Sequence, residues 1–214
     1  FSFVQLNTNG LRLAADPDYA VQLKEAGLAS VFLQFDGLSA ASHQALRGRD
    51  LRAVKEAAIR HAAAAGLGIV LVPTLVPGVN TTEVGAIIDY AVRFAPAVRG
   101  VHFQPVSYFG RFPQAPADGD RLTLPEVIAL IAVQSGGAIR PEHFAPPACE
   151  HALCSFHGTF LIDEDGRLQP LGNRQPACCA TGPTPTALEG REKSVSFTAR
   201  QWSLPLAATD CGCP

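Results

Sequence analysis

Short apolar runs and amphipathic segments alternate along the first 110 residues of the chain. Four apolar runs predict strands that end in polar or turn residues: FSFVQLNTNG (1–10), SVFLQFDG (30–37), LGIVLVPTLV (67–76) and VRGVHFQPV (98–106). The segments between them predict helices over 16–28, 49–66 and 81–95. The first helix has Asp16 at its N-cap, Pro17 at its first position and Gly27 just past its end, which are typical start and stop signals of a helix.

The order of these elements predicts the fold class. The strands are apolar almost throughout, which is typical of a parallel sheet with both faces covered, and the spacing of about 25 to 40 residues leaves room for crossover helices. In the helix over 49–66, Leu51, Val54, Ala58 and Ala62 share one apolar face. We therefore expect an α/β domain of repeated strand–helix units over residues 1–112.

The chain changes character after residue 112. Residues 113–139 indicate a connecting loop and one more helix, in which Thr123 and Glu126 form a predicted capping box. Residues 140–214 are rich in loops and proline, and their one regular signal is GTFLIDEDGRLQPL, a predicted hairpin around Asp165-Gly166. We treat this last segment as a separate cysteine-containing extension.

Charge and length exclude few functions. The 17 basic and 19 acidic residues give a formal charge of -2, which supplies no reason to expect nucleic acid or an anionic membrane as partner. No apolar run approaches the roughly 20 residues that span a bilayer, and the opening residues do not resemble a signal peptide. Because the chain lacks methionine and opens inside a predicted strand, we expect a fragment of a longer protein, so the missing signal peptide says little about location. The α/β body is of cytosolic type, which favours a cytoplasmic protein.

The cysteines all lie in the last segment: Cys149, Cys154, Cys178, Cys179, Cys211 and Cys213. A loop-rich segment buries little apolar surface, so a cysteine cluster there usually acts as a staple. Disulfides are least favoured beside a body of cytosolic type. Zinc remains open, with His151 and His157 as further candidate ligands, although no cysteine pair has the spacing of a zinc knuckle. An iron–sulfur cluster tolerates irregular spacing and is slightly favoured over zinc.

Polar groups gather where the predicted strands end. These ends read NTNG, QFDG, VPTLVPGVN and FQPVSYFGR. In parallel α/β sheets, ligands bind outside the carboxyl ends of the strands. Asn9-Gly10 and Asp36-Gly37 each also fit a simple turn. Polar groups at the ends of all the predicted strands nevertheless favour a shared pocket.

The order of these motifs resembles a known family. TNG closing a strand, a strand ending in FDG with ALRG further on, and a strand leading to PGVN resemble the middle and later part of a radical S-adenosylmethionine (SAM) domain. FQPVSYFGR and CEHALCSFHGTFLI resemble the subgroup that contains the tetraether lipid synthases and related selenocysteine-containing proteins. The resemblance covers nearly the whole chain. It implies a partial (β/α)6 barrel, similar to a TIM barrel, with SAM at the strand ends and an auxiliary iron–sulfur cluster in the cysteine-rich extension.

One departure from the family limits the resemblance. The CxxxCxxC loop that holds the family's catalytic [4Fe-4S] cluster is absent from this sequence, as is the glycine-rich stretch that holds the methionyl amine. Both would precede Phe1. We therefore interpret the chain as the C-terminal part of such an enzyme, inactive alone, which begins near the third barrel strand.

The resemblance also implies roles for individual residues. Arg47 matches a position that faces the SAM carboxylate, where a guanidinium offers bidentate pairing, and its alternative role is a solvated charge. Thr8 and Asn9 match the pocket wall near the methionyl end. Gln34 stands where relatives often carry a serine near the ribose. The other candidates are polar residues at strand ends: Asp36, Asn80 and Gln104.

The implied function is reductive cleavage of SAM to a 5′-deoxyadenosyl radical, an oxidoreductase-type reaction that activates a C–H bond of an unknown small-molecule, lipid or peptide substrate. Electrons would come from a donor such as ferredoxin or flavodoxin. No catalytic side chain is expected in this chain, and the six cysteines are the candidate ligands of the auxiliary cluster. Two alternatives remain open: a (β/α) lyase or isomerase with a zinc-stapled tail, and a noncatalytic cysteine-rich metal-binding or electron-transfer module.

Overall fold

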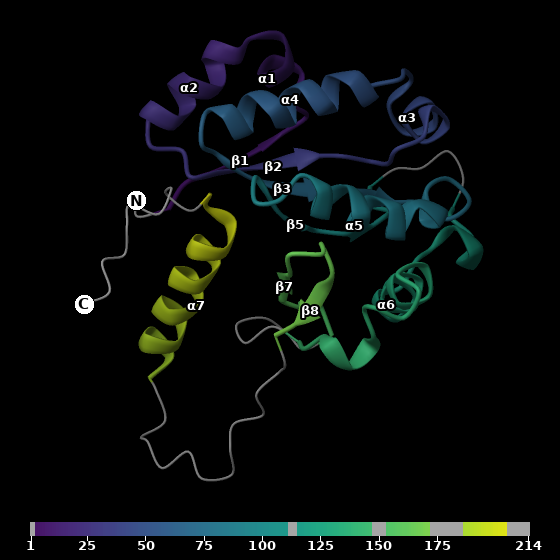
Figure 1. Cartoon of the computed structure of the whole chain (residues 1–214). Helices are drawn as coiled ribbons and strands as arrows, with labels where there is room; N and C mark the ends of the chain where they lie inside the picture. Colours follow the sequence, from purple (N-terminus) through teal and green to yellow (C-terminus); the bar gives the residue numbers. More distant parts are fainter. Residues whose placement is uncertain (1–2, 111–114, 147–152, 172–185, 205–214) are drawn as a thin grey trace.

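The structure, a computed structural model, describes residues 3–110, 115–146, 153–171 and 186–204. At its centre lies a four-stranded parallel sheet with the order β1-β2-β3-β5 (Figure 1). Its strands are β1 (Gln5–Thr8), β2 (Ser30–Gln34), β3 (Gly68–Val72) and β5 (Val98–Val101). Each strand falls within a predicted run, which confirms an α/β fold with a parallel sheet. β1 and β5 form the two edges of this sheet.

The helices that connect these strands are α1 (Leu11–Ala15), α2 (Pro17–Glu25), α3 (Ala40–Arg47), α4 (Arg52–Ala64) and α5 (Val84–Arg93), the last preceded by a 3-10 turn, η1 (Thr81–Glu83). The three predicted helices are confirmed as α2, α4 and α5. At the start of α2, the Asp16 carboxylate accepts a hydrogen bond from the Tyr19 backbone N–H over 3.2 Å, as its N-cap position predicts. The sequence analysis missed α1 and α3, which are too short to show a clear period.

Alternate residues of the strands meet two different environments. Val31, Leu33, Ile69 and Leu71 are at most 1% exposed and pack against the connecting helices on the outer face of the sheet. Their neighbours on the opposite, inner face include partly exposed residues such as Phe32. Among the described residues, the carboxyl half of this inner face lines a pocket, whereas Phe32 is packed against Trp202.

Two of the central strands continue past a break. Pro73 ends β3, and the chain resumes as β4 (Thr74–Leu75), which pairs in parallel with β6 (Gln104–Pro105). Leu75 lies in a second apolar core that also contains residues of α5 and of α6 (Leu124–Gln134). The predicted capping box of α6 is confirmed, since the Glu126 carboxylate accepts a hydrogen bond from the Thr123 backbone N–H over 2.7 Å. Short 3-10 turns flank α6: η2 (Asp118–Asp120) and η3 (Pro141–His143).

The second core extends into the segment that was predicted to be an extension. The predicted hairpin is confirmed as antiparallel β7 (Phe160–Ile162) and β8 (Leu168–Pro170). The Phe144 ring packs edge-on against Phe156 and Phe160, with centroid distances of 5.0 and 6.5 Å. These rings pack against the α6 core, so the described residues of this segment are held in part by apolar contacts, which the sequence analysis did not anticipate.

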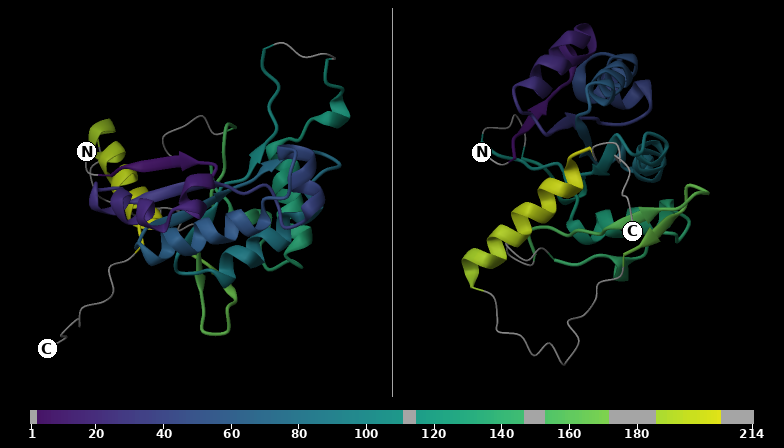
Figure 2. Two further views of the ribbon diagram at one scale, coloured as in Figure 1. Left: turned by 90° about the horizontal axis from the view of Figure 1, so that it is seen from above. Right: turned by 60° about the vertical axis from the view of Figure 1, so that its left-hand side comes forward.

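The long helix α7 (Ala187–Trp202) was also missed by the sequence analysis, which found only the hairpin in this part of the chain. A capping box between Thr186 and Glu189 begins it, and this motif is readable in the sequence. α7 lies on the opposite side of the sheet from α2 and α4, as Figures 1 and 2 show. Its last residue, Trp202, packs against Phe32 with the two rings tilted by 58° and their centroids 4.7 Å apart, and the Arg99 Nε donates to the Gln201 carbonyl over 2.8 Å.

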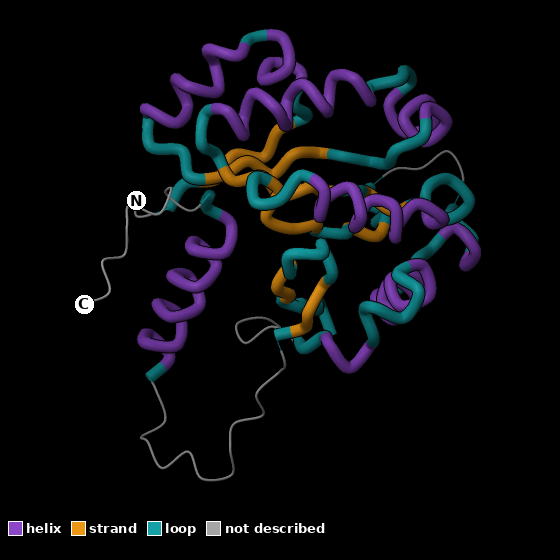
Figure 3. Tube along the Cα trace, viewed as in Figure 1, coloured by secondary structure: helices purple, strands orange, loops and turns teal. Residues whose placement is uncertain are grey.

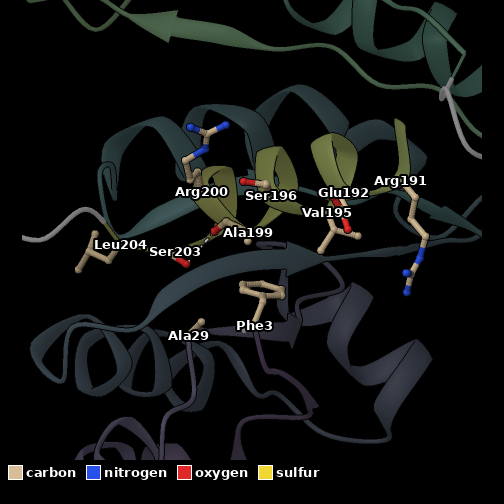
Figure 4. Close-up of a pocket in the computed structure, with 10 residues that line it drawn as sticks. All are labelled: Phe3, Ala29, Arg191, Glu192, Val195, Ser196, Ala199, Arg200, Ser203 and Leu204. Carbon is tan, nitrogen blue, oxygen red and sulfur yellow. Dashed lines mark hydrogen bonds between the residues drawn. The ribbon is translucent and has the colours of Figure 1, made fainter. Parts of the chain in front are cut away.

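A hollow of about 770 Å³ lies between α7 and the amino ends of the strands (Figure 4). Phe3 and Ala29 line it on the sheet side, and Val195 and Ala199 line it from α7. Its wall includes Phe3 and Leu204. None of the described helices is both long and apolar enough to cross a membrane.

Candidate functional site

A smaller pocket, of about 310 Å³, lies at the carboxyl ends of the central strands and is called the rim pocket below. Its lining residues come from β1, β2, β3, β4 and β6, the strands drawn in orange in Figure 3, and from Asn9 just after β1: Asn7, Thr8, Asn9, Phe32, Gln34, Val72, Thr74 and Gln104. Most of these side chains offer amide or hydroxyl groups, and Phe32 and Val72 add an apolar patch. Four of the candidate site residues, Thr8, Asn9, Gln34 and Gln104, therefore line one pocket.

The turn after β1 shapes one wall of the rim pocket. The Thr8 hydroxyl accepts a hydrogen bond from the Gly10 backbone N–H over 3.1 Å, and the Asn9 side-chain oxygen accepts one from Leu11 over the same distance. Gly10 has a φ of 78°, and a Cβ added there would lie 2.5 Å from Leu33 Cδ1. Only glycine adopts this φ and fits beside Leu33 without strain, so the conformation of the turn depends on Gly10.

Arg47 lies at the end of α3 and is bound by the buried carboxylate of Asp36. Its Nε and Nη2 donate to the two carboxylate oxygens over 2.7 and 2.8 Å. Asp36 is 0% exposed and the Arg47 side chain is 30% exposed. The hydrogen bonds that Arg47 donates to Asp36 raise the pKa of Arg47 above its ordinary value, so the guanidinium stays charged.

This pair changes the geometry expected for Arg47. The Nε–Nη2 edge of its guanidinium, one of the edges that could pair with a ligand carboxylate as the resemblance implies, is occupied by Asp36. The Gln34 amide lies against the same guanidinium and, with its oxygen turned toward it, is 3.1 Å from Nη1. Arg47 and Asp36 do not line the rim pocket. They support it from behind, through Gln34 and through the Thr74 backbone N–H, which lies 3.4 Å from the Asp36 carboxylate.

Asn80 is also a supporting residue in this structure. Its side chain is fully buried, and its amide nitrogen donates to the carbonyls of Asp36 and Thr74 over 2.6 and 2.8 Å. Its side-chain oxygen accepts from the Val76 backbone N–H over 2.8 Å. With the amide satisfied on both sides, Asn80 joins the end of β2 to the chain that follows β3.

Two further buried side chains hold strand-end carbonyls, and the sequence analysis missed both. His43 of α3 has its Nε2 3.0 Å from the Gly37 carbonyl oxygen, and Lys55 of α4 donates from Nζ to the Asn9 carbonyl over 2.6 Å. Both are 0% exposed. The burial of Lys55 could have been predicted from the sequence. Lys55 lies three residues before Ala58 and seven before Ala62, so it shares the apolar face of its helix.

Burial, hydrogen bonds and nearby charges shift the pKa values of two side chains that support the rim pocket, Lys55 and Glu83. Burial lowers the pKa of Lys55 to about 8, Asp36 opposes this shift, and Arg47 adds to it. Burial alone would raise the pKa of Glu83, but hydrogen bonds from Ser42, Leu38 and Ser39 hold it below its ordinary value. The Glu83 carboxylate thus binds the start of α3 as an anion, and it accepts from the Ser39 backbone N–H over 3.0 Å.

The predicted metal ligands are largely outside the described residues. Cys149, Cys178, Cys179, Cys211 and Cys213 lie there, while Cys154 is described and has a free, exposed thiol. Within the part of the chain that the structure describes, no group of three or more His, Cys, Asp and Glu side chains could hold a metal ion. The described residues alone therefore do not fit an iron–sulfur cluster.

Comparison with known proteins identifies two similar enzymes, and no family model matches the chain. The chain is 38% identical over 192 residues to a 7,8-dihydro-6-hydroxymethylpterin dimethyltransferase of Methanocaldococcus jannaschii, a match that covers 80% of this chain and 38% of the relative. It is 31% identical over 153 residues to a GTP 3′,8-cyclase of Corynebacterium glutamicum, covering 70% of this chain and 39% of the relative. The chain thus spans about two fifths of the length of the curated relatives it matches.

Proposed function

We propose that this chain is the later part of a radical SAM enzyme and that its rim pocket binds SAM. The dimethyltransferase that it resembles is a radical SAM enzyme, and the similarity covers 80% of the chain. The observation that carries the proposal is the meeting of Thr8, Asn9, Gln34 and Gln104 in one pocket at the carboxyl ends of a parallel sheet, where α/β enzymes bind their ligands. The tetraether lipid synthase-like subgroup remains part of the proposal.

The rim pocket suits SAM in size and in chemistry. Ligand pockets in proteins usually exceed about 300 Å³, and this one measures about 310 Å³. Its amides and hydroxyls can donate to and accept from a ribose and an amino acid group, and the Phe32 ring and Val72 offer an apolar surface to a base. When bound and reduced by an iron–sulfur cluster, SAM supplies the carbon radical that removes hydrogen from a substrate.

In this proposal the residues have two kinds of role. Thr8, Asn9, Gln34 and Gln104 contact SAM and orient it, while Phe32 and the α7 end behind it limit access of water from the amino side of the sheet. Asp36, Arg47 and Asn80 hold the strand ends in place. The substrate is a separate matter, since the names of the two relatives denote a pterin substrate and GTP, respectively. We extend only the broader class, a small molecule, to this chain.

We also propose that the extension carries an auxiliary iron–sulfur cluster with ligands among the six cysteines. The support is the confinement of all cysteines to residues 149–213. Iron and acid-labile sulfide measured per chain in the full-length protein after anaerobic reconstitution test this assignment. Loss of iron in Cys154→Ala is expected, whereas stoichiometric zinc without sulfide would overturn the cluster.

Calorimetric titration of SAM into the anaerobically purified full-length protein tests the main proposal. Gln104→Ala is expected to weaken SAM binding by about 0.5–1.5 kcal/mol, the usual value of one hydrogen bond. Gln22→Ala is the matched control, because Gln22 is exposed on α2, away from the rim. No SAM binding by the unchanged protein, or equal binding by Gln104→Ala and the unchanged protein, contradicts the proposal.

A further inference from the structure

Lys55 is a charged side chain in the apolar interior. It is 0% exposed and lies on the face of α4 that also buries Ala58, Ile59 and Ala62. Its Nζ donates to the Asn9 carbonyl over 2.6 Å. Among the ion pairs of the described residues, none includes Lys55. One hydrogen bond to a backbone carbonyl thus accounts for the contacts seen at its ammonium.

This arrangement disfavours the charged form, which is why burial lowers the pKa of Lys55 to about 8. An apolar side chain of similar length would fill the same space without desolvating a charge. Lys24 makes a comparable bond, from Nζ to the Gly66 carbonyl over 2.7 Å, but from a partly exposed position. The buried lysine therefore destabilises the folded state, and destabilising residues of this kind concentrate at functional sites.

The position of Lys55 shows what it faces. The carbonyl it holds belongs to Asn9, which lines the rim pocket. Besides burial, the charges of Asp36 and Arg47 influence the pKa of Lys55. Asp36 pairs bidentately with Arg47, and the Glu83 carboxylate is bound at the start of α3 by Ser39. Among the described residues, the Lys55 ammonium therefore has no carboxylate partner of its own behind the β1 end of the pocket.

We propose that Lys55 is a positioning residue of the rim pocket, which fixes the Asn9 turn and selects an anionic group of the ligand at the Thr8–Asn9 wall. This inference rests on the proposed binding of SAM and adds to it the residue, Lys55, that sets the preference for a carboxylate at this wall. Arg47 is engaged by Asp36, so Lys55 supplies the uncompensated charge at this wall. The ammonium acts through the pocket wall and through Asn9, without direct contact with the ligand.

The test compares SAM with decarboxylated SAM, which lacks only the carboxylate, in titrations of the full-length protein and its variants. Lys55→Met is expected to weaken SAM binding about tenfold, the scale of one Coulomb interaction at moderate distance. Binding of decarboxylated SAM is expected to stay within about twofold, because it offers no anion to select. Lys24→Met, which removes the matched bond at the other end of the sheet, is expected to leave both affinities unchanged.

The outcomes separate this inference from the proposed function. The inference fails if the unchanged protein binds SAM and Lys55→Met either keeps its affinity for both ligands or binds both more weakly by the same factor. Either result would mean that Lys55 does not select the carboxylate. If the unchanged protein does not bind SAM, the proposed function fails first. Should Lys55→Met not fold, Lys55→Gln replaces it, because its amide can still donate toward Asn9 without carrying charge, and the same selective loss of SAM is expected.

Discussion

The Arg47 guanidinium and the Asp36 carboxylate form two hydrogen bonds of 2.7 and 2.8 Å, between the end of α3 and the end of β2. This pair decides how the rim of the sheet is built. The positive charge of Arg47 neutralises the fully buried Asp36 carboxylate, so Arg47 is already paired within the protein. The strand-end turn of β2 is consequently fixed by charge as well as by backbone pairing.

Asp36→Asn removes one charge of this pair and leaves the partly buried Arg47 without its anion. We expect the free energy of unfolding to fall by about 1–3 kcal/mol, less than for a fully buried pair because Arg47 retains some solvent. Denaturant unfolding of the two proteins measures the difference. Asp50→Asn is the control, since the Asp50–Arg52 pair is exposed and its loss should change stability little. Equal effects of both substitutions would contradict the structural role of Asp36.

The lowered pKa of Lys55 predicts a stability that rises with pH. The folded value of about 8 lies below the ordinary value of 10.5, so in this interval the unfolded chain binds the proton more tightly and the folded state gains as pH rises. We expect the free energy of unfolding of the unchanged protein to increase, relative to that of Lys55→Met, between pH 8 and 10.5. Urea unfolding across this range checks the difference. Parallel pH profiles would show that Lys55 is not desolvated.

Gly10→Ala tests the turn that lines the rim pocket. The new Cβ combines a positive φ of 78° with an overlap on Leu33. Gly27→Ala is the matched control, because Gly27 has a φ of 93° but its Cβ would have no neighbour within 4 Å. We expect Gly27→Ala to cost about 1–2 kcal/mol and Gly10→Ala to cost about 1–3 kcal/mol more, from the overlap. Thermal or denaturant unfolding measures both losses of stability. Equal losses in the two variants would mean that the Cβ at position 10 does not overlap Leu33.

Gly68→Ala tests the contact between α7 and the sheet. A Cβ at Gly68 would overlap the Trp202 backbone oxygen, whereas one at Gly100 would have no neighbour within 4 Å. Trp202 is the sole tryptophan of the chain, so its fluorescence reports on this contact. We expect a red-shifted emission and faster proteolysis near α7 in Gly68→Ala, and an unchanged spectrum in Gly100→Ala. An unshifted Gly68→Ala spectrum would mean that α7 does not pack there.

Much of the fold could be predicted because its signals are local. The apolar runs, Asp16 at the N-cap of α2 and the Thr123–Glu126 capping box each involve residues close in sequence, and the confirmed strands and helices follow from them. The same local rule would have found the start of α7, where Thr186 and Glu189 repeat the capping box.

The sequence by itself determined the α/β class, the order of the strands along the chain and the presence of polar residues at their carboxyl ends. Only the tertiary structure decided which of these residues share a pocket and which hold it. Arg47 and Asp36, eleven positions apart, pair across the end of a strand, and Lys55 reaches Asn9 from 46 positions away. Such contacts depend on how helices dock on the sheet, and periodicity within one element contains no information about that docking.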